Sequence, residues 1–325
     1  MEISTFMKKK TLITLLSTAA VVLVSSLIFF VIYPERGNRY QEEEANLDGH
    51  PIYSQYSFST DPGVINIGIQ PLYLPTGVIF EAVKRDKILK HALSDLGVTV
   101  EYYPFLKGDD VNYFLYKKKL DSGIGGDMPA ISAACEIDIT IPLVVQNGFD
   151  SIITKKLILI SDLMNKRIAY PFGSISHYTI LNTLAMAGIS EKDVKLVAMD
   201  VPEMAEALSA NRIHAFTAWE PMVAEALQDH PDFKRNFRSM TSGYMYFTNE
   251  IVKSNPQAVK QIIAAVVRSF RWFHLDIDNL ILSSKWNLEA GRALTGKKSN
   301  LSESDIARLA KKDILQYNSP PPVSE

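Results

Sequence analysis

The stretch RIAYPFGSISHYTILNTLAMAG, which occupies residues 167–188, contains a complete step from a strand to a helix. Residues 167–170 suit a short buried strand, and residues 176–187 have the length of a helix that Gly188 can end. The loop between them, residues 172–177, places a glycine, serine hydroxyls and backbone N–H groups at the helix start. The stretch therefore predicts one strand–loop–helix unit of an α/β fold, with a candidate ligand loop at its centre.

The same alternation of strands and helices extends on both sides of this stretch. Before Asp150 we expect strands at residues 65–70, 98–105, 122–125 and 137–146, and helices at residues 76–96, 109–119 and 128–134. Further along we expect strands at residues 194–199, 215–219 and 244–248, and helices at residues 202–210 and 255–282. This order predicts an α/β chain with mainly parallel sheets and two similar halves.

The N-terminus carries the pattern of a membrane segment. Lys8, Lys9 and Lys10 precede an uncharged run, residues 11–33, which as a helix would reach roughly 34 Å and cross a bilayer core. Because basic residues stay in the cytoplasm, we expect residues 1–33 to form a cytoplasmic tip and a single-pass inner-membrane anchor. Polar residues 34–63 would be a tether, and the rest would lie in the periplasm or outside the cell. A cleaved signal peptide is the alternative, although no small-x-small site follows the apolar run.

The composition excludes several classes of protein. The 325 residues are 47% hydrophobic with a formal net charge of −2, which is unlike a basic nucleic-acid-binding domain. Cys135 is the single cysteine, so an internal disulfide and the zinc sites that need two or four cysteines are excluded. The sequence has no G-x-S-x-G elbow, phosphate-binding loop, H-E-x-x-H pair or spaced glycine triplet. We therefore expect no enzyme, no cofactor and no metal.

Three loops between a strand and a helix are candidate ligand loops: residues 70–77, 125–129 and 172–177. Ser174 and Ser176 at a helix start favour an anionic or strongly accepting ligand group. Either serine could equally be only the N-cap of that helix, and His177 only a structural histidine. Asp127 could cap the next helix or, if it faced the ligand, would favour an amine or a hydroxyl donor.

Two aromatic residues are candidates for the walls of a pocket. Tyr73 follows Gln70 in the first loop, and Trp219 ends a strand just before Glu220, which can cap the next helix. A buried aromatic residue more often belongs to the core, so both interpretations stay open.

Four motifs occur in an order that resembles a known family: GGDMP at 125–129, GSISH at 173–177, AGISEKDV at 187–194 and AFTAWEP at 215–221. Over residues 64–312 the chain resembles the periplasmic solute-binding proteins of the aliphatic sulfonate, nitrate, taurine and thiamine-precursor (NMT1-like) ABC importers. The resemblance implies a type II periplasmic-binding fold, in which two α/β lobes joined by a two-strand hinge enclose the ligand. Lobe I would comprise residues 64–149 and 243–318, lobe II residues 150–242, and residues 319–325 a tail.

The resemblance also implies a function and a site. The chain would close around a small solute by hinge motion and deliver it to an ABC permease and its ATPase. The cleft would be lined by Gln70, Tyr73, Gly126, Asp127, Ser174, Ser176, His177, Trp219 and Glu220. The ligand would be a sulfonate-like organic anion or a nitrogen or sulfur compound such as a heteroaromatic pyrimidine, and the sequence does not decide between them.

The chain departs from the family pattern in ways that leave other functions open. It has an apparent anchor in place of a cleaved signal, and Cys135-Glu136 replaces the family's common Ala-Gly. A membrane-anchored sensory module that binds the same class of solute is therefore an alternative. Relatives that make the thiamine pyrimidine share the fold but carry neighbouring cysteines for iron, whereas Cys135 stands alone.

Overall fold

The computed structural model describes residues 46–314. The predicted anchor at residues 11–33, most of the predicted tether and the predicted tail lie outside these residues. Within residues 46–314, no helix is both long enough and apolar enough to cross a membrane. The chain divides into a unit of residues 1–50 and a unit of residues 51–325. In the first unit a 3-10 turn, η3 (Leu47–Gly49), is capped by Asn46, and all other elements below belong to the second unit.

A single mixed sheet of eight strands, in the order β2-β1-β3-β8-β4-β7-β5-β6, runs through the described residues of the second unit. At one end β1 (Val64–Ile69) pairs in parallel with β2 (Thr99–Pro104) and β3 (Ser122–Gly126). At the other end β5 (Arg167–Tyr170) pairs in parallel with β6 (Lys195–Ala198) and β7 (Ala215–Trp219). The predicted α/β class and its parallel strands are confirmed.

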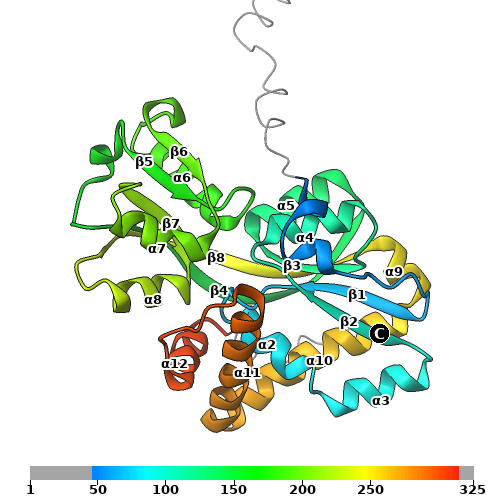
Figure 1. Ribbon diagram of the computed structural model, residues 1–325. Helices are drawn as coiled ribbons and strands as arrows, with labels where there is room; N and C mark the ends of the chain where they lie inside the picture. The colour runs from blue at the N-terminus through cyan, green and yellow to red at the C-terminus, as the bar shows by residue number, and fades with distance from the viewer. Residues whose placement is uncertain (1–45, 315–325) are drawn as a thin grey trace, which may run out of the picture. The chain divides into compact units, whose positions relative to one another are not determined.

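Two long antiparallel strands, β4 (Ile139–Thr154) and β8 (Lys234–Thr248), join the two parallel ends (Figure 1). The strands predicted at residues 137–146 and 244–248 were too short. Strand β8 is hydrogen bonded to β3 and β4, and strand β4 to β8 and β7. Pairing on both sides extends each strand through polar residues that interrupt the alternation of apolar and polar positions expected of a strand. We call β1–β3 with their helices the first section, and β5–β7 with theirs the second section.

Helices cover both sections. Those of the first section are α2 (Thr76–Val83), α3 (Lys87–Asp95), α4 (Gly108–Tyr116), α5 (Asp127–Glu136), α9 (Asn249–Ser254), α10 (Pro256–Leu275), α11 (Ile277–Thr295) and α12 (Glu303–Asp313). Those of the second section are α6 (Ile175–Met186), α7 (Val201–Ser209) and α8 (Met222–Asp229), with 3-10 turns at η5 (Ile160–Leu163) and η6 (Glu191–Asp193).

Two predicted helices are each divided in two by an aspartate. The helix expected at residues 76–96 ends at Val83, because Asp86 adopts an extended backbone and accepts hydrogen bonds from the N–H groups of Ile88 and Leu89 at 2.8 and 3.0 Å. The region expected at residues 255–282 is divided at Asp276, whose side chain caps α11. Aspartate favours the N-cap position over a helix interior. A prediction from the spacing of apolar residues alone therefore missed both helix boundaries.

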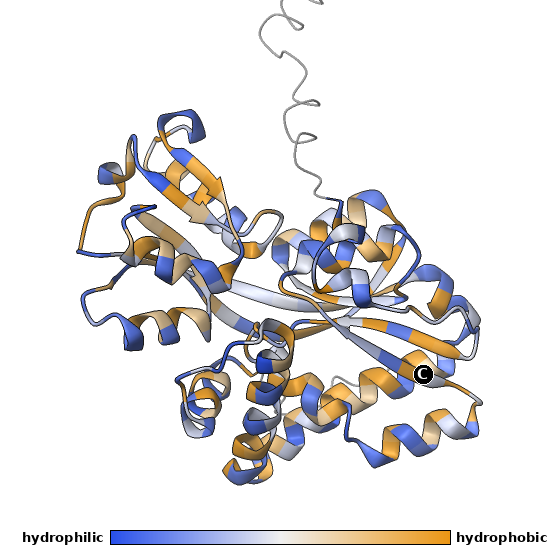
Figure 2. Cartoon of the chain, viewed as in Figure 1, coloured by the Kyte–Doolittle hydropathy of each residue, from blue (hydrophilic) through white to orange (hydrophobic). Residues whose placement is uncertain are grey.

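The hydrophobic core is divided between the sections. In the first section, buried residues of β1, α2 and α10 such as Ile67, Ile79 and Ile262 form one cluster. In the second, Ile168 and Ile180 belong to a cluster between β5 and α6. Figure 2 shows hydrophobic residues along the strands of both sections and hydrophilic residues toward the outer faces of the helices.

Residues 53–58 pack against the first section, although they fall within the predicted tether. Tyr53 is buried, its hydroxyl donates to Asp110 Oδ2 at 2.6 Å, and its ring centroid lies 5.0 Å from that of Phe105. Tyr56 and Phe58 extend the same aromatic cluster over β2 and α4. We call residues 53–58 the strap.

Candidate functional site

Four loops that follow parallel strands or β3 carry the predicted site residues. Gln70 and Tyr73 lie between β1 and α2, and Ser174 lies just before α6. Gly126 ends β3 and Asp127 begins α5, while Trp219 ends β7 and Glu220 follows it before α8. Two hydrogen bonds join loops of different sections: Trp219 Nε1 donates to the Leu72 carbonyl at 2.7 Å, and the Leu74 N–H donates to the Glu220 carbonyl at 3.0 Å. The fold therefore brings the predicted loops to one seam between the sections.

Two glycines allow the loops of the sections to approach closely. A Cβ atom on Gly126 would lie 2.9 Å from Ile175 Cβ at the start of α6. A Cβ atom on Gly173 would lie 2.2 Å from Asp109 Cγ of α4, and Gly173 also has a φ of +67°, which other residues rarely adopt. A side chain at either position would force the sections apart, so these glycines are required for the contact.

A buried aspartate lies at the centre of this seam. Asp150 is fully buried in β4, between β7 and β8, and its Oδ1 atom accepts a hydrogen bond from the Ser176 hydroxyl. Its Oδ2 atom has no hydrogen-bond partner among the described residues. Burial raises the pKa of Asp150 to about 8, although the neighbouring hydroxyl groups of Ser176 and Thr179 oppose the increase. The carboxyl group is therefore mainly protonated at neutral pH.

Several other buried hydroxyl groups have no hydrogen-bond partner among the described residues. They belong to Tyr73 in the first section and to Thr179, Thr183 and Thr217 in the second. Burial raises the pKa of the Tyr73 hydroxyl, and the nearby carboxyl groups of Asp127 and Asp150 add to this effect. Each unsatisfied buried polar group costs about 1–3 kcal/mol of stability. A bound molecule that formed hydrogen bonds with these hydroxyl groups would remove part of this cost.

Tyr73 and Trp219 form an aromatic pair beside this cluster. Their ring centroids lie 5.8 Å apart at an interplanar angle of 74°, and both side chains are buried. The pair is built from one residue of each section, so it exists only while the sections are in contact. Flat faces of this kind suit an aromatic ring or a cation.

Other predicted site residues already use their polar atoms within the protein. Gln70 Nε2 donates to the Ile124 carbonyl and so ties β1 to β3. Asp127 accepts hydrogen bonds from the Ser242 N–H at 3.0 Å and from the Tyr244 hydroxyl at 2.9 Å, both on β8. Glu220 Oε2 accepts from the Ala224 N–H at 2.9 Å, and its Oε1 lies 2.8 Å from Arg235.

Within the loop before α6 the two serines differ. Ser174 is the N-cap of α6, because its hydroxyl accepts from the His177 N–H at 3.4 Å and donates to the Pro171 carbonyl at 2.6 Å. Ser176 instead points to Asp150. His177 is buried against the rings of Tyr170 and Phe172, and burial lowers its pKa to about 4, so it is neutral at physiological pH.

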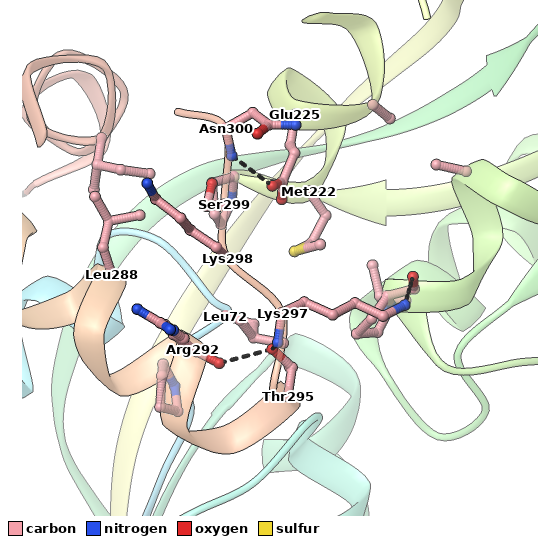
Figure 3. Close-up of a pocket in the computed structure, with 18 of the residues that line it drawn as sticks. Leu72, Met222, Glu225, Leu288, Arg292, Thr295, Lys297, Lys298, Ser299 and Asn300 are labelled. Atoms are coloured by element: carbon pink, nitrogen blue, oxygen red, sulfur yellow. Dashed lines mark hydrogen bonds between the residues drawn. The ribbon is translucent and has the colours of Figure 1, made fainter. Parts of the chain in front are cut away.

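A cavity of about 220 Å³ opens on the other side of Leu72, and its lining includes Pro202, Phe216, Pro221 and Asn287. Figure 3 shows Met222 and Glu225 of α8 facing Leu288 and Arg292 of α11 across it. Residues 297–300 bound the cavity, with the Asn300 N–H donating to Glu225 Oε1 at 3.2 Å and Lys297 Nζ to the Pro202 carbonyl at 3.2 Å. The cavity therefore also lies between the two sections, adjoining the aromatic pair through Leu72.

Neither the role of Asp150 nor the cavity was predicted from the sequence. Asp150 carried one signal, because it is a lone acidic residue within the otherwise apolar and amide-bearing run 142–154. The cavity carried none, since its lining comes from elements that are distant in the chain and have no motif in common. No cluster of three or more histidine, cysteine, aspartate or glutamate side chains suited to a metal occurs within residues 46–314.

One protein-family model matches part of the chain. Residues 141–276 match the family model described as NMT1/THI5 like. The matched range begins in β4 and ends just after α10, so it includes Asp150, the loop before α6 and the Trp219–Glu220 turn. The resemblance to NMT1-like solute-binding proteins that the sequence motifs predicted is therefore confirmed.

Curated relatives match over a shorter length. A protein of Brucella abortus (strain 2308) that carries the provisional name of a binding protein is 28% identical over 185 residues, which is 52% of this chain and 54% of the relative. The taurine-binding periplasmic protein of Escherichia coli (strain K12) is 30% identical over 131 residues, which is 39% of this chain and 41% of the relative. The chain thus spans about half the length of the curated relatives it matches.

A solved structure supports the fold over a larger part of the chain. The alkanesulfonate-binding protein SsuA from Xanthomonas axonopodis pv. citri, bound to MOPS, superposes with a TM-score of 0.62 at 19% identity, covering 80% of this chain and 89% of that chain. The architecture is therefore that of the periplasmic binding proteins. These relatives are named as binding proteins, which agrees with the expectation of a protein that is not an enzyme.

Proposed function

We propose that the chain is the extracytoplasmic solute-binding component of an ABC-type importer. The first and second sections would act as lobes I and II, with residues 64–149 and 243–318 in lobe I and residues 150–242 in lobe II. A permease and its ATPase would receive the solute, and residues 11–33 would hold the chain at the inner membrane. The names of the relatives and the fold support the class, and the site supports a solute between the lobes.

The observation that carries this proposal is a set of buried polar atoms without partners among the described residues, which includes Asp150 Oδ2 and the hydroxyl groups of Tyr73, Thr179 and Thr217. Tyr73 comes from one lobe and Thr179 and Thr217 from the other, so a ligand there contacts both lobes at once. A ligand stabilises the closed arrangement only through contacts that the open one lacks. Strands β4 and β8, which cross between the lobes, are suited to act as the hinge.

Ligand binding by the full chain in detergent micelles tests the proposal. We would measure thermal unfolding with taurine, a series of alkanesulfonates, nitrate and aminopyrimidines. A ligand at 100 times its dissociation constant adds about 2.7 kcal/mol to stability, which gives a clear shift in the unfolding temperature. A folded protein that none of these compounds stabilises would contradict the proposal.

Two variants locate the site. Tyr73→Phe keeps the ring but removes the buried hydroxyl, so it should reduce the ligand-induced shift with no loss of stability in the ligand-free protein. Tyr178→Phe makes the same change at an exposed position of α6 and should leave the shift unchanged. Equal ligand-induced shifts in both variants would place the ligand elsewhere, for example in the cavity beside Leu72.

A further inference from the structure

We infer that Lys107 and Asp200 form a latch that favours the closed arrangement of the two lobes, and that the strap sets the strength of this latch. This inference rests on the proposed function, because a latch needs lobes that open and close. It adds to that function a regulatory contact outside the proposed ligand site. It follows from an ion pair between the lobes, from an N-cap aspartate that does not cap its helix, and from hydrogen bonds that connect the pair to the strap.

Lys107 and Asp200 make an ion pair across the seam between the lobes. Lys107 is the N-cap residue of α4 in lobe I, and its Nζ atom lies 3.3 Å from Oδ1 of Asp200 in lobe II. The Lys107 side chain is 14% exposed and the Asp200 side chain 35%, so salt and water screen this pair less than a fully exposed one. Separation of the lobes would break the pair, so its attraction favours the closed arrangement.

Asp200 gives up a local role to make this contact. It is the N-cap residue of α7, where an aspartate usually accepts a hydrogen bond from the N–H group of the second or third helical residue. Here the second helical residue is Pro202, which has no N–H group, and within the described residues the Asp200 side chain makes no cap hydrogen bond. The Glu203 N–H, bonded to the Asp200 carbonyl at 3.1 Å, is the local alternative for the carboxylate when the lobes open. Asp200 therefore has a partner available in each arrangement.

Other contacts bring the lobes together close to this pair. Lys297 Nζ, from the loop after α11, donates to the Pro202 carbonyl at 3.2 Å. At the start of α4, Asp109 Cγ would lie 2.2 Å from a Cβ atom on Gly173, so α4 and the loop before α6 are in close contact. The latch residues do not belong to the set of buried polar atoms proposed to meet the solute. The latch would therefore change the affinity for solute by changing the closed population.

The strap connects to the latch through Asp110. Oδ1 of Asp110 lies 2.7 Å from Lys107 Nζ, and Oδ2 accepts a hydrogen bond from the Tyr53 hydroxyl at 2.6 Å. The same hydroxyl accepts from the Leu106 N–H at 2.9 Å, directly before Lys107. Without the Tyr53 hydroxyl, the buried Asp110 would depend more strongly on Lys107 and would draw it away from Asp200. The strap in place therefore strengthens the latch, and by linkage closure of the lobes strengthens the contacts of the strap.

Distances between spin labels in the full chain, in detergent micelles without ligand, test the latch. One label is placed on the single cysteine, Cys135, which is exposed on α5 of lobe I, and the other on Met186→Cys, at an exposed position that ends α6 of lobe II. Pulsed electron paramagnetic resonance then measures the closed and open populations. Asp200→Asn keeps a capping side chain but loses the charge, so the ratio of closed to open protein should fall about fivefold. Glu203→Gln removes an exposed charge from the first turn of the same helix and should leave the ratio unchanged.

A second matched pair of variants tests the role of the strap. Tyr53→Phe removes the hydroxyl that donates to Asp110 and should lower the closed population. Tyr56→Phe removes a strap hydroxyl that donates to the Pro104 carbonyl instead, and should leave the closed population unchanged. High salt should lower the closed population of the unchanged protein but not that of Asp200→Asn, because salt screens the attraction between the latch residues.

Equal ratios of closed to open protein in Asp200→Asn and Glu203→Gln would overturn the latch, and equal ratios in the two tyrosine variants would overturn the role of the strap. If Asp200→Asn does not fold, the salt dependence of the unchanged protein decides, and a ratio that about 1 M sodium chloride leaves unchanged overturns the latch. Label distances that respond to these variants in a folded protein that binds none of the tested solutes would support the latch and contradict the proposed function.

Discussion

Asp110 and Asp150 are both buried aspartates, but their surroundings differ. Asp110, in α4, lies 2.7 Å from Lys107 Nζ and accepts a hydrogen bond from the strap residue Tyr53 at 2.6 Å. Asp150, in β4, has no cationic neighbour and one oxygen without any partner among the described residues. A buried carboxylate with its partners in place supports the fold, whereas one without them is suited to meet a ligand.

The network around Asp110 also reaches the second section. Lys107 Nζ lies 3.3 Å from Asp200, which precedes α7. Burial lowers the pKa of Lys107, but the charges of Asp110 and Asp200 outweigh this effect and raise it above its ordinary value. Lys107 therefore stays charged at physiological pH and connects the strap, the first section and the second section.

The largest expected effect comes from breaking the satisfied site. Asp110→Ala leaves Lys107 and the Tyr53 hydroxyl without their buried partner, so we expect a loss of about 3–5 kcal/mol in the free energy of unfolding. Urea unfolding followed by tryptophan fluorescence measures it. Asp138→Ala, at an exposed position, is the control and should change little. A loss below about 1 kcal/mol for Asp110→Ala would mean that the pair contributes as little as a surface ion pair.

Asp150→Asn should increase the free energy of unfolding rather than lower it, and the size of the increase should depend on pH. The unfolded state loses the Asp150 proton near pH 4, whereas the folded state keeps it up to about pH 8. The unfolded state thus binds fewer protons in this window, and the stability of the unchanged protein falls as pH rises, by up to about 1.4 kcal/mol per pH unit.

The asparagine variant lacks this dependence. Its free energy of unfolding relative to the unchanged protein should therefore increase from pH 5 to pH 8 and become constant above pH 8. Urea unfolding at each pH measures the difference. A difference that does not vary with pH would show that Asp150 is ionised in the folded protein.

Tyr53→Phe should have the smallest of these effects. It removes a hydroxyl that donates to Asp110 and accepts from the Leu106 N–H at 2.9 Å, so we expect a loss of about 1–2 kcal/mol in the free energy of unfolding. Tyr73→Phe is the matched control, because the Tyr73 hydroxyl has no hydrogen-bond partner among the described residues and its removal should cost nothing. If Tyr73→Phe lowered the free energy of unfolding more than Tyr53→Phe, the hydroxyl near Asp150 would contribute more to stability than the one bonded to Asp110, contrary to this comparison.

Some parts of the fold were predictable from local sequence alone. The strand at residues 167–170 and the strand at residues 215–219 were predicted with the bounds that the structure shows, because short β-branched or aromatic runs bounded by turn residues have one favoured conformation. The starts of α3 and α11 were not predicted, because a capping aspartate competes with the apolar period. The lengths of β4 and β8 were not predicted either, because their pairing partners lie elsewhere in the chain.

The sequence by itself determined the α/β class, the loops that follow the strands and the resemblance to NMT1-like binding proteins, since these depend on residues close together in the chain. Only the tertiary structure decided that Asp150 is buried, that Ser176 rather than Ser174 points to it, and that Tyr73 and Trp219 meet beside it. The physical reason is that burial, charge and unsatisfied hydrogen bonds depend on neighbours that are distant in the chain, and Tyr73 is 77 residues from Asp150 and 146 from Trp219.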